Sequence, residues 1–104
     1  MNWLTGGRFA QGEAKRLIAL LSDSTKRDIA ARELIKLGAD AVPALIDGLQ
    51  TQDPSLLLSL QHILARIPAA FPHLIKTLGS AHPILRGRAA EVFSISKDQT
   101  AISA

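Results

Sequence analysis

Three short segments of the chain repeat one pattern: Arg16-Leu-Ile-Ala-Leu-Leu-Ser22, Ala44-Leu-Ile-Asp-Gly-Leu-Gln50 and His73-Leu-Ile-Lys-Thr-Leu-Gly79. In each segment a Leu-Ile pair is followed, after two residues, by a second leucine, and the copies start 28 and 29 residues apart. Pro43 and Pro72 come immediately before the second and third copies. A period of this length is typical of arrays in which one supersecondary unit stacks on the next. The three segments therefore predict a repeat fold.

A second set of apolar segments lies between these copies, and a shift of 29 residues aligns Ala31 with Leu60 and Ala89. In both kinds of segment the apolar residues recur every three or four positions, which indicates helices with one buried stripe. The stripes of this second set are Ile29, Ala30, Leu34 and Leu37 in one copy, and Leu56, Leu60, Ile63, Leu64 and Ile67 in the next.

The expected architecture is all-α, an α-solenoid of stacked antiparallel helical hairpins. Residues 1–11 are expected to form an N-terminal segment ahead of a repeat domain over 12–104. Helices are predicted near residues 12–22, 25–37, 40–50, 54–67, 70–79 and 83–95, with a last segment beginning near Asp98. The 29-residue offset puts the next Leu-Ile copy at 103 and beyond, so we expect either a longer array or another chain covering this end.

Several residues mark the expected helix ends. Asp53-Pro54 and His82-Pro83 should begin helices, because a proline in the first turn loses no hydrogen bond. Asp40 is expected to cap the helix that follows it. Gly38 and Gly79 lie just past helix ends, where a left-handed residue is favoured.

The pattern resembles the HEAT family, in particular the short bacterial HEAT-like repeats first described in phycobilin lyases. The resemblance covers roughly residues 12–96. The second copy departs from it, with Ile67 in place of Gly38 and Ser59-Leu60 in place of an Ala-Ala pair. The segments that carry the resemblance are Ala30-Ala-Arg-Glu-Leu-Ile-Lys-Leu-Gly38, Ala41-Val-Pro-Ala-Leu-Ile46 with Leu49, and Arg86-Gly-Arg-Ala-Ala-Glu-Val92.

The resemblance implies a right-handed superhelix whose concave side is lined by the second helix of each pair. Family members commonly hold a protein partner there, some serve chromophore-attaching enzymes, and a few small bacterial members bind DNA along a basic groove. We therefore expect a non-catalytic protein–protein interaction scaffold that binds through its concave surface. The alternatives are a DNA-binding module or an accessory domain of a phycobilin-lyase-type enzyme.

The composition of the chain excludes several classes of protein. The chain has 104 residues, no cysteine and a net charge of +3, with 47% hydrophobic residues. This is the composition of one folded domain, and the absence of cysteine excludes disulfides and thiolate zinc sites. No segment looks like a signal peptide or a membrane span. We therefore expect a cytoplasmic protein with no membrane contact.

No catalytic pattern stands out in the sequence. Gly6-Gly7 and Gly12 do not match a phosphate-binding loop. His62, His73 and His82 are 11 and 9 residues apart and fall in different segments, whereas a metal site needs ligands that converge. We expect no enzyme activity, no metal and no cofactor.

The helical register predicts which residues line the concave surface. If the Leu-Ile-x-x-Leu positions face the core, the flanking residues should form rows across the stack. These rows are Arg16, Ala44 and His73, and Ala19, Asp47 and Lys76; Arg16, Asp47, His73 and Lys76 are the expected partner-binding residues. Arg86 and Arg88 should lie elsewhere, on the convex side or the ridge. The Leu56-Leu57-Leu58 run has more apolar residues than one stripe requires, and Leu58 is the one that falls outside the stripe. We favour its burial against the neighbouring repeat; the alternative is an exposed contact patch for a partner.

Positive charge gathers in the first third of the chain. One interpretation is a phosphate-binding patch formed by Lys15, Lys26, Arg27, Arg32 and Lys36. The interpretation we favour is a solvated face with internal ion pairs, such as Asp28 with Arg32 or Glu33 with Lys36. No aromatic residue is interleaved for base stacking, so a protein partner is expected before a nucleic acid.

Overall fold

The computed structural model of the chain describes the backbone of residues 7–103 and the side chains of residues 12–97. Within that part every regular element is helical, which confirms the all-α class. The elements are α2 (Gly7–Leu20), α3 (Arg27–Leu37), the 3-10 helix η1 (Gly38–Ala41), α4 (Val42–Gly48), α5 (Pro54–Ala65), the 3-10 helix η2 (Pro68–Ala70), α6 (Phe71–Leu78) and α7 (Pro83–Ser103).

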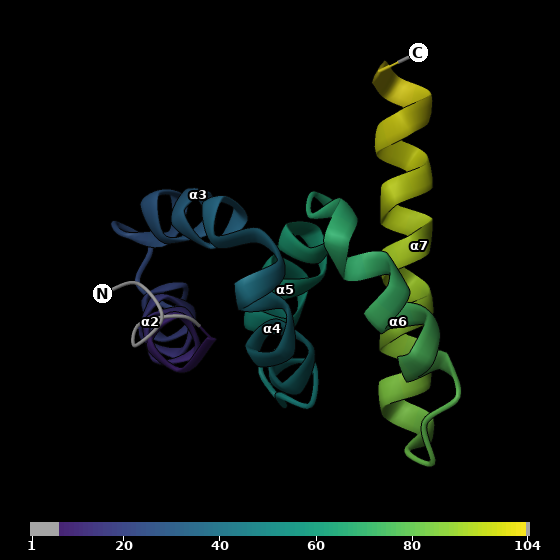
Figure 1. The fold of residues 1–104 in the computed structure, drawn as a ribbon. Coiled ribbons are helices and arrows are strands. Elements are labelled where there is room, and N and C mark those ends of the chain that lie inside the picture. The colour runs from purple at the N-terminus through teal and green to yellow at the C-terminus, as the bar shows by residue number, and fades with distance from the viewer. Residues whose placement is uncertain (1–6, 104) are drawn as a thin grey trace.

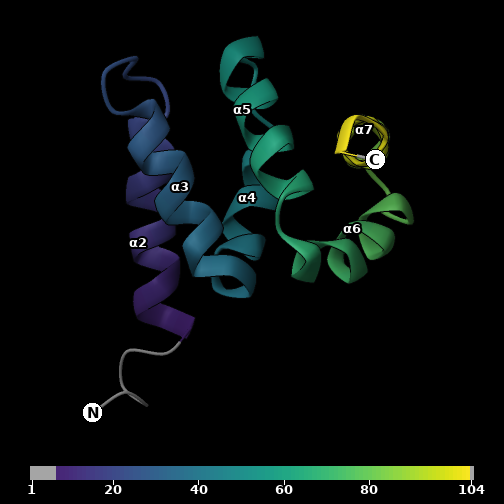
Figure 2. The same cartoon turned by 90° about the horizontal axis from the view of Figure 1, so that it is seen from above.

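The helices follow one another along an arc. Figure 2 shows α2 and α3 at one end, α4 and α5 in the middle, and α6 and α7 at the other end. Helix α5 packs between α3 and α7, while α2 packs against both α3 and α4, and α6 packs against α7. The helices paired in the sequence prediction, α3 with α4 and α5 with α6, meet mainly through the 3-10 helices between them.

The two ends of the helical region differ from the prediction. Helix α2 begins at Gly7, inside the segment expected to precede the repeats, and residues 1–6 lie outside the described part. Helix α7 continues to Ser103 instead of ending near residue 95 (Figure 1). The separate last segment expected from Asp98 is therefore wrong. The physical reason is local, because residues 94–103 contain neither glycine nor proline to stop the helix.

The core is built from the leucines of the repeated pattern. Leu45, Leu49 and Leu74 are fully buried, and burial of a leucine side chain stabilises a fold by about 1.5–3 kcal/mol. The other buried leucines are Leu17, Leu21, Leu34, Leu60 and Leu64.

The buried stripes contain three errors. The prediction that the whole Leu-Ile-x-x-Leu pattern faces the core is wrong for Ile75 and Leu78, which are 60% and 39% exposed. It is also wrong for Ile29, which is 61% exposed on α3. Periodicity identifies residues that share a face, but burial needs a neighbouring helix to cover that face, and α6 has no such helix over Ile75.

The helix ends agree with the sequence in part. Helix α5 begins at Asp53-Pro54 as predicted, and Asp53 caps it, because its Oδ1 accepts hydrogen bonds from the N–H groups of Ser55 and Leu56 at 3.0 and 3.4 Å. Asp40 is not the cap of α4: it lies within η1, and Ala41 holds the cap position with no side-chain hydrogen bond. The extra 3-10 turn also places Pro43 in the first turn of α4.

The two glycines at helix ends behave differently. Gly38 has φ +58° and closes α3, a backbone conformation that glycine adopts without strain. Gly79 has φ −93°, so the left-handed conformation predicted for it is wrong. The chain leaves α6 through an ordinary turn, in which the N–H of Gly79 bonds the carbonyl of Lys76 at 3.0 Å.

Candidate interaction surface

The four residues predicted to bind a partner all lie on the surface. Arg16 is on α2, Asp47 on α4, and His73 and Lys76 are on α6, each with an exposed side chain. Helix α2 packs against α4, whereas α4 and α6 share no extensive contact. Ala44, expected in the same row, is 7% exposed and belongs to the core, so its place on the concave surface was wrong.

Arg16 forms an ion pair within its own helix. Its Nη2 and Nε lie 2.5 and 3.1 Å from the two carboxylate oxygens of Glu13, three residues earlier. The hydrogen bond from Arg16 holds the pKa of Glu13 below its usual value, and the same bond raises the pKa of Arg16. Arg16 therefore offers a partner less free charge than Lys76, which has no carboxylate on its helix.

The predicted basic patch is spread over α2 and α3. Lys15 lies on α2 and Lys26 directly precedes α3, which carries Arg27, Arg32 and Lys36; all five side chains are exposed. The predicted pair of Lys36 with Glu33 is present, at 4.0 Å. Asp28 does not pair with Arg32 but lines a groove between α3 and α5.

Arginine side chains bind carbonyl groups at the carboxyl ends of α2, α4 and α6. Arg27 donates from Nε to the carbonyl of Leu21 at 2.9 Å, and Arg86 donates to that of Ser80 at 2.7 Å. The last carbonyls of a helix lack partners within it and carry partial negative charge. The carbonyls of Leu21 and Ser80 lie one and two residues past the ends of α2 and α6, so each guanidinium binds a carbonyl of the following turn and places its positive charge near a helix carboxyl end.

Arg88 makes the longest-range of these contacts. Its half-buried guanidinium donates from Nη1 to the carbonyls of Leu49 and Thr51, the latter at 2.7 Å, and so joins α7 to the end of α4. The sequence predicted only that Arg88 lies away from the concave rows, on the convex side or the ridge, and did not predict this contact. Sequence patterns give no signal for this contact, because it links residues 37 and 39 positions apart.

Gln61 is a buried polar residue on α5 that contacts α7, and no pattern in the sequence predicts it. It is 2% exposed, and its Nε2 lies 3.2 Å from the carbonyl of Arg88 and 3.0 Å from a carboxylate oxygen of Glu91. Together with Arg88, it fixes α7 against the preceding repeat by polar contacts, in addition to apolar packing.

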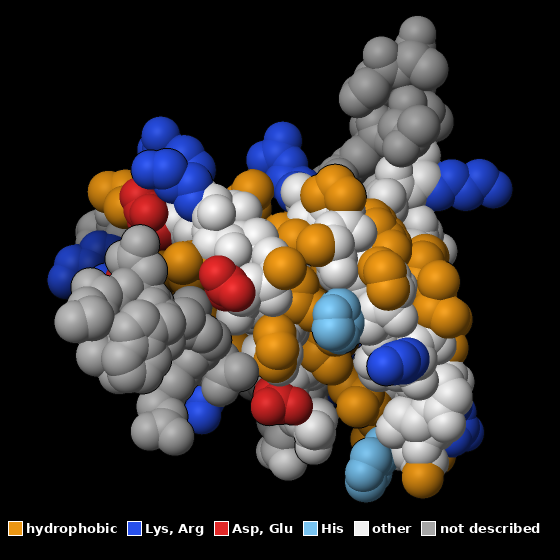
Figure 3. Space-filling view, viewed as in Figure 1, with side chains coloured by type: hydrophobic (Ala, Val, Ile, Leu, Met, Phe, Trp, Pro, Cys, Tyr) orange, Lys and Arg blue, Asp and Glu red, His pale blue; other side chains and the backbone are white. Residues whose placement is uncertain are grey.

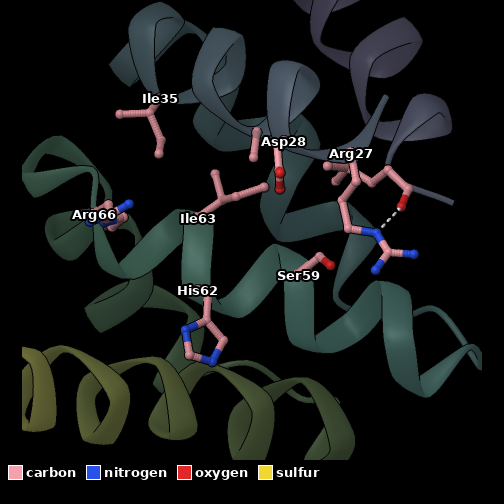
Figure 4. Close-up of a pocket in the computed structure, with 9 residues that line it drawn as sticks. Arg27, Asp28, Ile35, Ser59, His62, Ile63 and Arg66 are labelled. Carbon is pink, nitrogen blue, oxygen red and sulfur yellow. Dashed lines mark hydrogen bonds between the residues drawn. The ribbon is translucent and has the colours of Figure 1, made fainter. Parts of the chain in front are cut away.

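A groove between α3 and α5 lies beside Arg27 and Arg66 (Figure 4). Figure 4 shows Arg27 and Arg66 at its two ends, with Ile35 and Ile63 between them. Its volume is about 190 Å³, below the roughly 300–1,000 Å³ of small-molecule pockets. Its other lining residues are Leu21, Asp28, Ala31, Ser59 and His62.

Titratable ligands do not converge in the described part of the chain. His62 lies on α5, His73 on α6, and His82 directly before α7. Among the residues that the structure describes, no group of three or more His, Asp or Glu side chains is placed to hold a metal ion. Over the same residues, no helix combines the length and apolarity needed to cross a bilayer.

Large apolar side chains are exposed on several helices. They are Ile29 on α3, Leu58 on α5, Ile75 and Leu78 on α6, and Ile84 on α7, each between 39% and 67% exposed. Leu58 is 55% exposed, so the favoured prediction that it is buried against the neighbouring repeat is wrong. Figure 3 shows hydrophobic side chains gathered over α6 and α7. Comparison of the chain with protein-family models, with curated proteins and with solved structures gave no match.

Proposed function

We propose that the chain is a non-catalytic protein-interaction scaffold built from HEAT-like repeats. The proposal rests first on the apolar side chains that α6 and α7 leave exposed: Ile75, Leu78 and Ile84. Isolated exposed apolar residues are ordinary, whereas apolar residues that cluster on neighbouring helices are typical of protein contact surfaces.

The repeat interpretation supports the proposed architecture. The 28- and 29-residue offsets recur in the order of the helices along the arc, and each repeat contacts mainly its neighbours, as in solenoids. The proposal retains the concave rows, with Asp47 and Lys76 as residues that would contact the partner. It includes a cytoplasmic location, which a cysteine-free composition fits.

Nucleic-acid binding is a weaker alternative. Arg27 is engaged with a backbone carbonyl and Lys36 is within 4.0 Å of Glu33, so part of the basic patch is already paired. An accessory role in chromophore attachment rests on the resemblance alone.

The test is affinity capture at physiological salt with the full chain and with the variant Asp47→Arg/Lys76→Glu. We expect a defined protein partner whose capture the double variant weakens, while Lys15→Glu, an exposed change on α2, leaves it intact. A partner captured equally by all three chains would contradict the concave assignment. Salt-sensitive binding of duplex DNA in an anisotropy titration, with no protein captured, would replace the proposal by the nucleic-acid alternative.

A further inference from the structure

The groove between α3 and α5 lies at a junction between successive repeats. Helices α3, α5 and α7 are equivalent elements of the repeat, because a shift of 29 residues aligns Ala31 with Leu60 and Ala89. Helices α5 and α7 pack together extensively, whereas α3 and α5 pack less closely. The groove therefore lies at the looser of two equivalent junctions.

The side chains differ between the two junctions. On α7, Arg88 donates a hydrogen bond to the carbonyl of Leu49 at the end of α4. The repeat places Ser59 of α5 at the position of Arg88, and Ser59 lines the groove. The carbonyl of Leu21, the counterpart of Leu49, is bonded instead by Arg27 of α3. The junction of α3 with α5 thus lacks the long side chain that links helices at the next junction.

The polar contacts between α5 and α7 also have no equivalent at the earlier junction. Gln61 of α5 donates hydrogen bonds to a carbonyl and to Glu91 of α7. The residues in the same register are Arg32 of α3 and His62 of α5. Within the described part of the chain, neither of these side chains forms a hydrogen bond or an ion pair. The groove is therefore not closed by polar contacts between the helices that form it.

The middle of the groove is apolar and has room for one large side chain. Figure 4 shows Ile35 of α3 and Ile63 of α5 there, and Ala31 lines the same space. The groove has a volume of about 190 Å³, and an engineered apolar cavity of about 150 Å³ is large enough to bind benzene. A leucine side chain of another protein would therefore fit between α3 and α5.

Positive charge lies at both ends of the groove (Figure 4). Arg27 bonds the carbonyl of Leu21 through Nε, so its two terminal nitrogens remain able to donate. The side chain of Arg66 forms no hydrogen bond or ion pair with another described residue. Asp28 lines the groove as well and pairs with neither arginine. Two guanidinium groups and one carboxylate give the groove an excess of positive charge.

We propose that this groove binds a segment of another protein in which one large apolar side chain has acidic residues on both sides. The apolar side chain packs against Ile35 and Ile63, and the carboxylates pair with Arg27 and Arg66 at the two ends. An arginine can bind a carboxylate through two parallel hydrogen bonds, and an apolar anchor in a pocket is a common centre of binding energy.

This site goes beyond the proposed scaffold function. It lies on α3 and α5, whereas Asp47 and Lys76 of the concave rows lie on α4 and α6. Binding in the groove therefore does not require the concave rows, and the two sites can be tested separately.

The experiment is a fluorescence-anisotropy titration of the full chain with three labelled peptides. The first has a leucine flanked by glutamates, the second has alanine in place of the leucine, and the third has lysines in place of the glutamates. We expect the first peptide to bind, and each of the others to bind more weakly by about tenfold or more. Equal binding of the first and second peptides would refute the apolar contact, and equal binding of the first and third would refute the role of the arginines. Failure of the first peptide to bind would overturn the proposal.

Matched variants locate the contact. Ser59→Arg puts a long side chain into the groove and should weaken binding of the first peptide by about tenfold or more. Ser94→Arg adds the same charge at an exposed serine of α7 outside the groove and should leave binding unchanged. Arg66→Glu should also weaken binding, whereas Arg32→Glu, at an exposed arginine of α3 outside the groove, should not. Circular dichroism melting checks that each variant folds. Equal effects within either pair would contradict the location.

The double variant Asp47→Arg/Lys76→Glu separates this site from the concave rows. It should weaken capture of a protein partner and leave binding of the first peptide unchanged. If it abolishes capture while the peptide fails to bind the unmodified chain, the scaffold proposal holds and the groove inference fails. If the double variant loses the peptide instead, the peptide binds at the concave rows and the groove inference is wrong.

Discussion

The middle and last copies of the repeat place the same Leu-Ile-x-x-Leu pattern in different surroundings. Leu49 at the end of the pattern on α4 is fully buried, whereas Leu78, its equivalent on α6, is 39% exposed. Helices α2 and α5 both pack against α4, whereas α6 packs against α7, the counterpart of α5, and makes no extensive contact with α4, the counterpart of α2. The pattern therefore identifies apolar side chains that can be buried. Where a neighbouring helix covers them they stabilise the fold, and where none does they stay exposed and can contact a partner.

The largest expected effect comes from shortening the covered leucine. Leu49→Ala should lower the free energy of unfolding by about 2–5 kcal/mol, because it removes buried apolar surface and leaves a cavity. Leu78→Ala should lower it by less than about 1 kcal/mol, since that side chain is partly in water already. Urea denaturation of both variants measures the contrast, and equal losses would break the comparison between the copies.

The next largest effect is expected from the contact between α7 and the end of α4. Arg88→Ala removes the hydrogen bonds to the carbonyls of Leu49 and Thr51, which should cost about 1.5–3 kcal/mol because the donor is charged. Arg86→Ala removes a comparable bond to Ser80 at an exposed site, so its loss should be smaller. If thermal or urea unfolding ranks the two variants in the opposite order, Arg88 does not stabilise the covering of α4.

A smaller effect on stability is expected at the residues that precede α5 and α4. Asp53→Ala should destabilise the fold by about 1 kcal/mol, because it removes the cap that bonds Ser55 and Leu56. Asp40→Ala should change stability by only a few tenths of a kcal/mol, as expected of an exposed residue that caps no helix. Urea midpoints that move equally for both aspartates would contradict the assigned caps.

The smallest effect concerns the exposed pair on α2. The pKa of Glu13 is below its usual value in the folded chain because of the hydrogen bond from Arg16. The stabilisation is therefore complete above the unfolded-state pKa of Glu13 and is lost as pH falls through the lower folded-state pKa. NMR titration of the Glu13 side chain should show its pKa rising in Arg16→Gln. An unchanged pKa in that variant would show that the pair does not persist in solution.

Local signals in the sequence predicted most of the helices. The helices over the Leu-Ile-x-x-Leu segments, the start of α5 at Asp53-Pro54 and the positive φ at Gly38 follow from spacing and backbone preference, and these features agree with the structure. The continuation of α7 to Ser103 was missed because the predicted end relied on the repeat offset rather than on a breaking residue.

The contacts between repeats were much less predictable. The carbonyl groups that Arg88 binds are 37 and 39 residues away, and no periodicity encodes a contact between a side chain and a distant backbone carbonyl. The exposure of Ile75 was missed for a related reason, since it depends on a neighbour that α6 lacks. The four residues expected on the concave surface, Arg16, Asp47, His73 and Lys76, have exposed side chains.

The link from Arg88 to the end of α4 also bears on how the molecule would respond to force. A load applied along α7 would reach α4 directly through Arg88, bypassing α6, which lies between them in the sequence. Helices α6 and α7 would then not separate from the rest of the chain before the hydrogen bonds from Arg88 to the carbonyls at the end of α4 had broken. Extension of the chain should therefore proceed with α7 and the α4–α5 region yielding together, rather than helix by helix from the end.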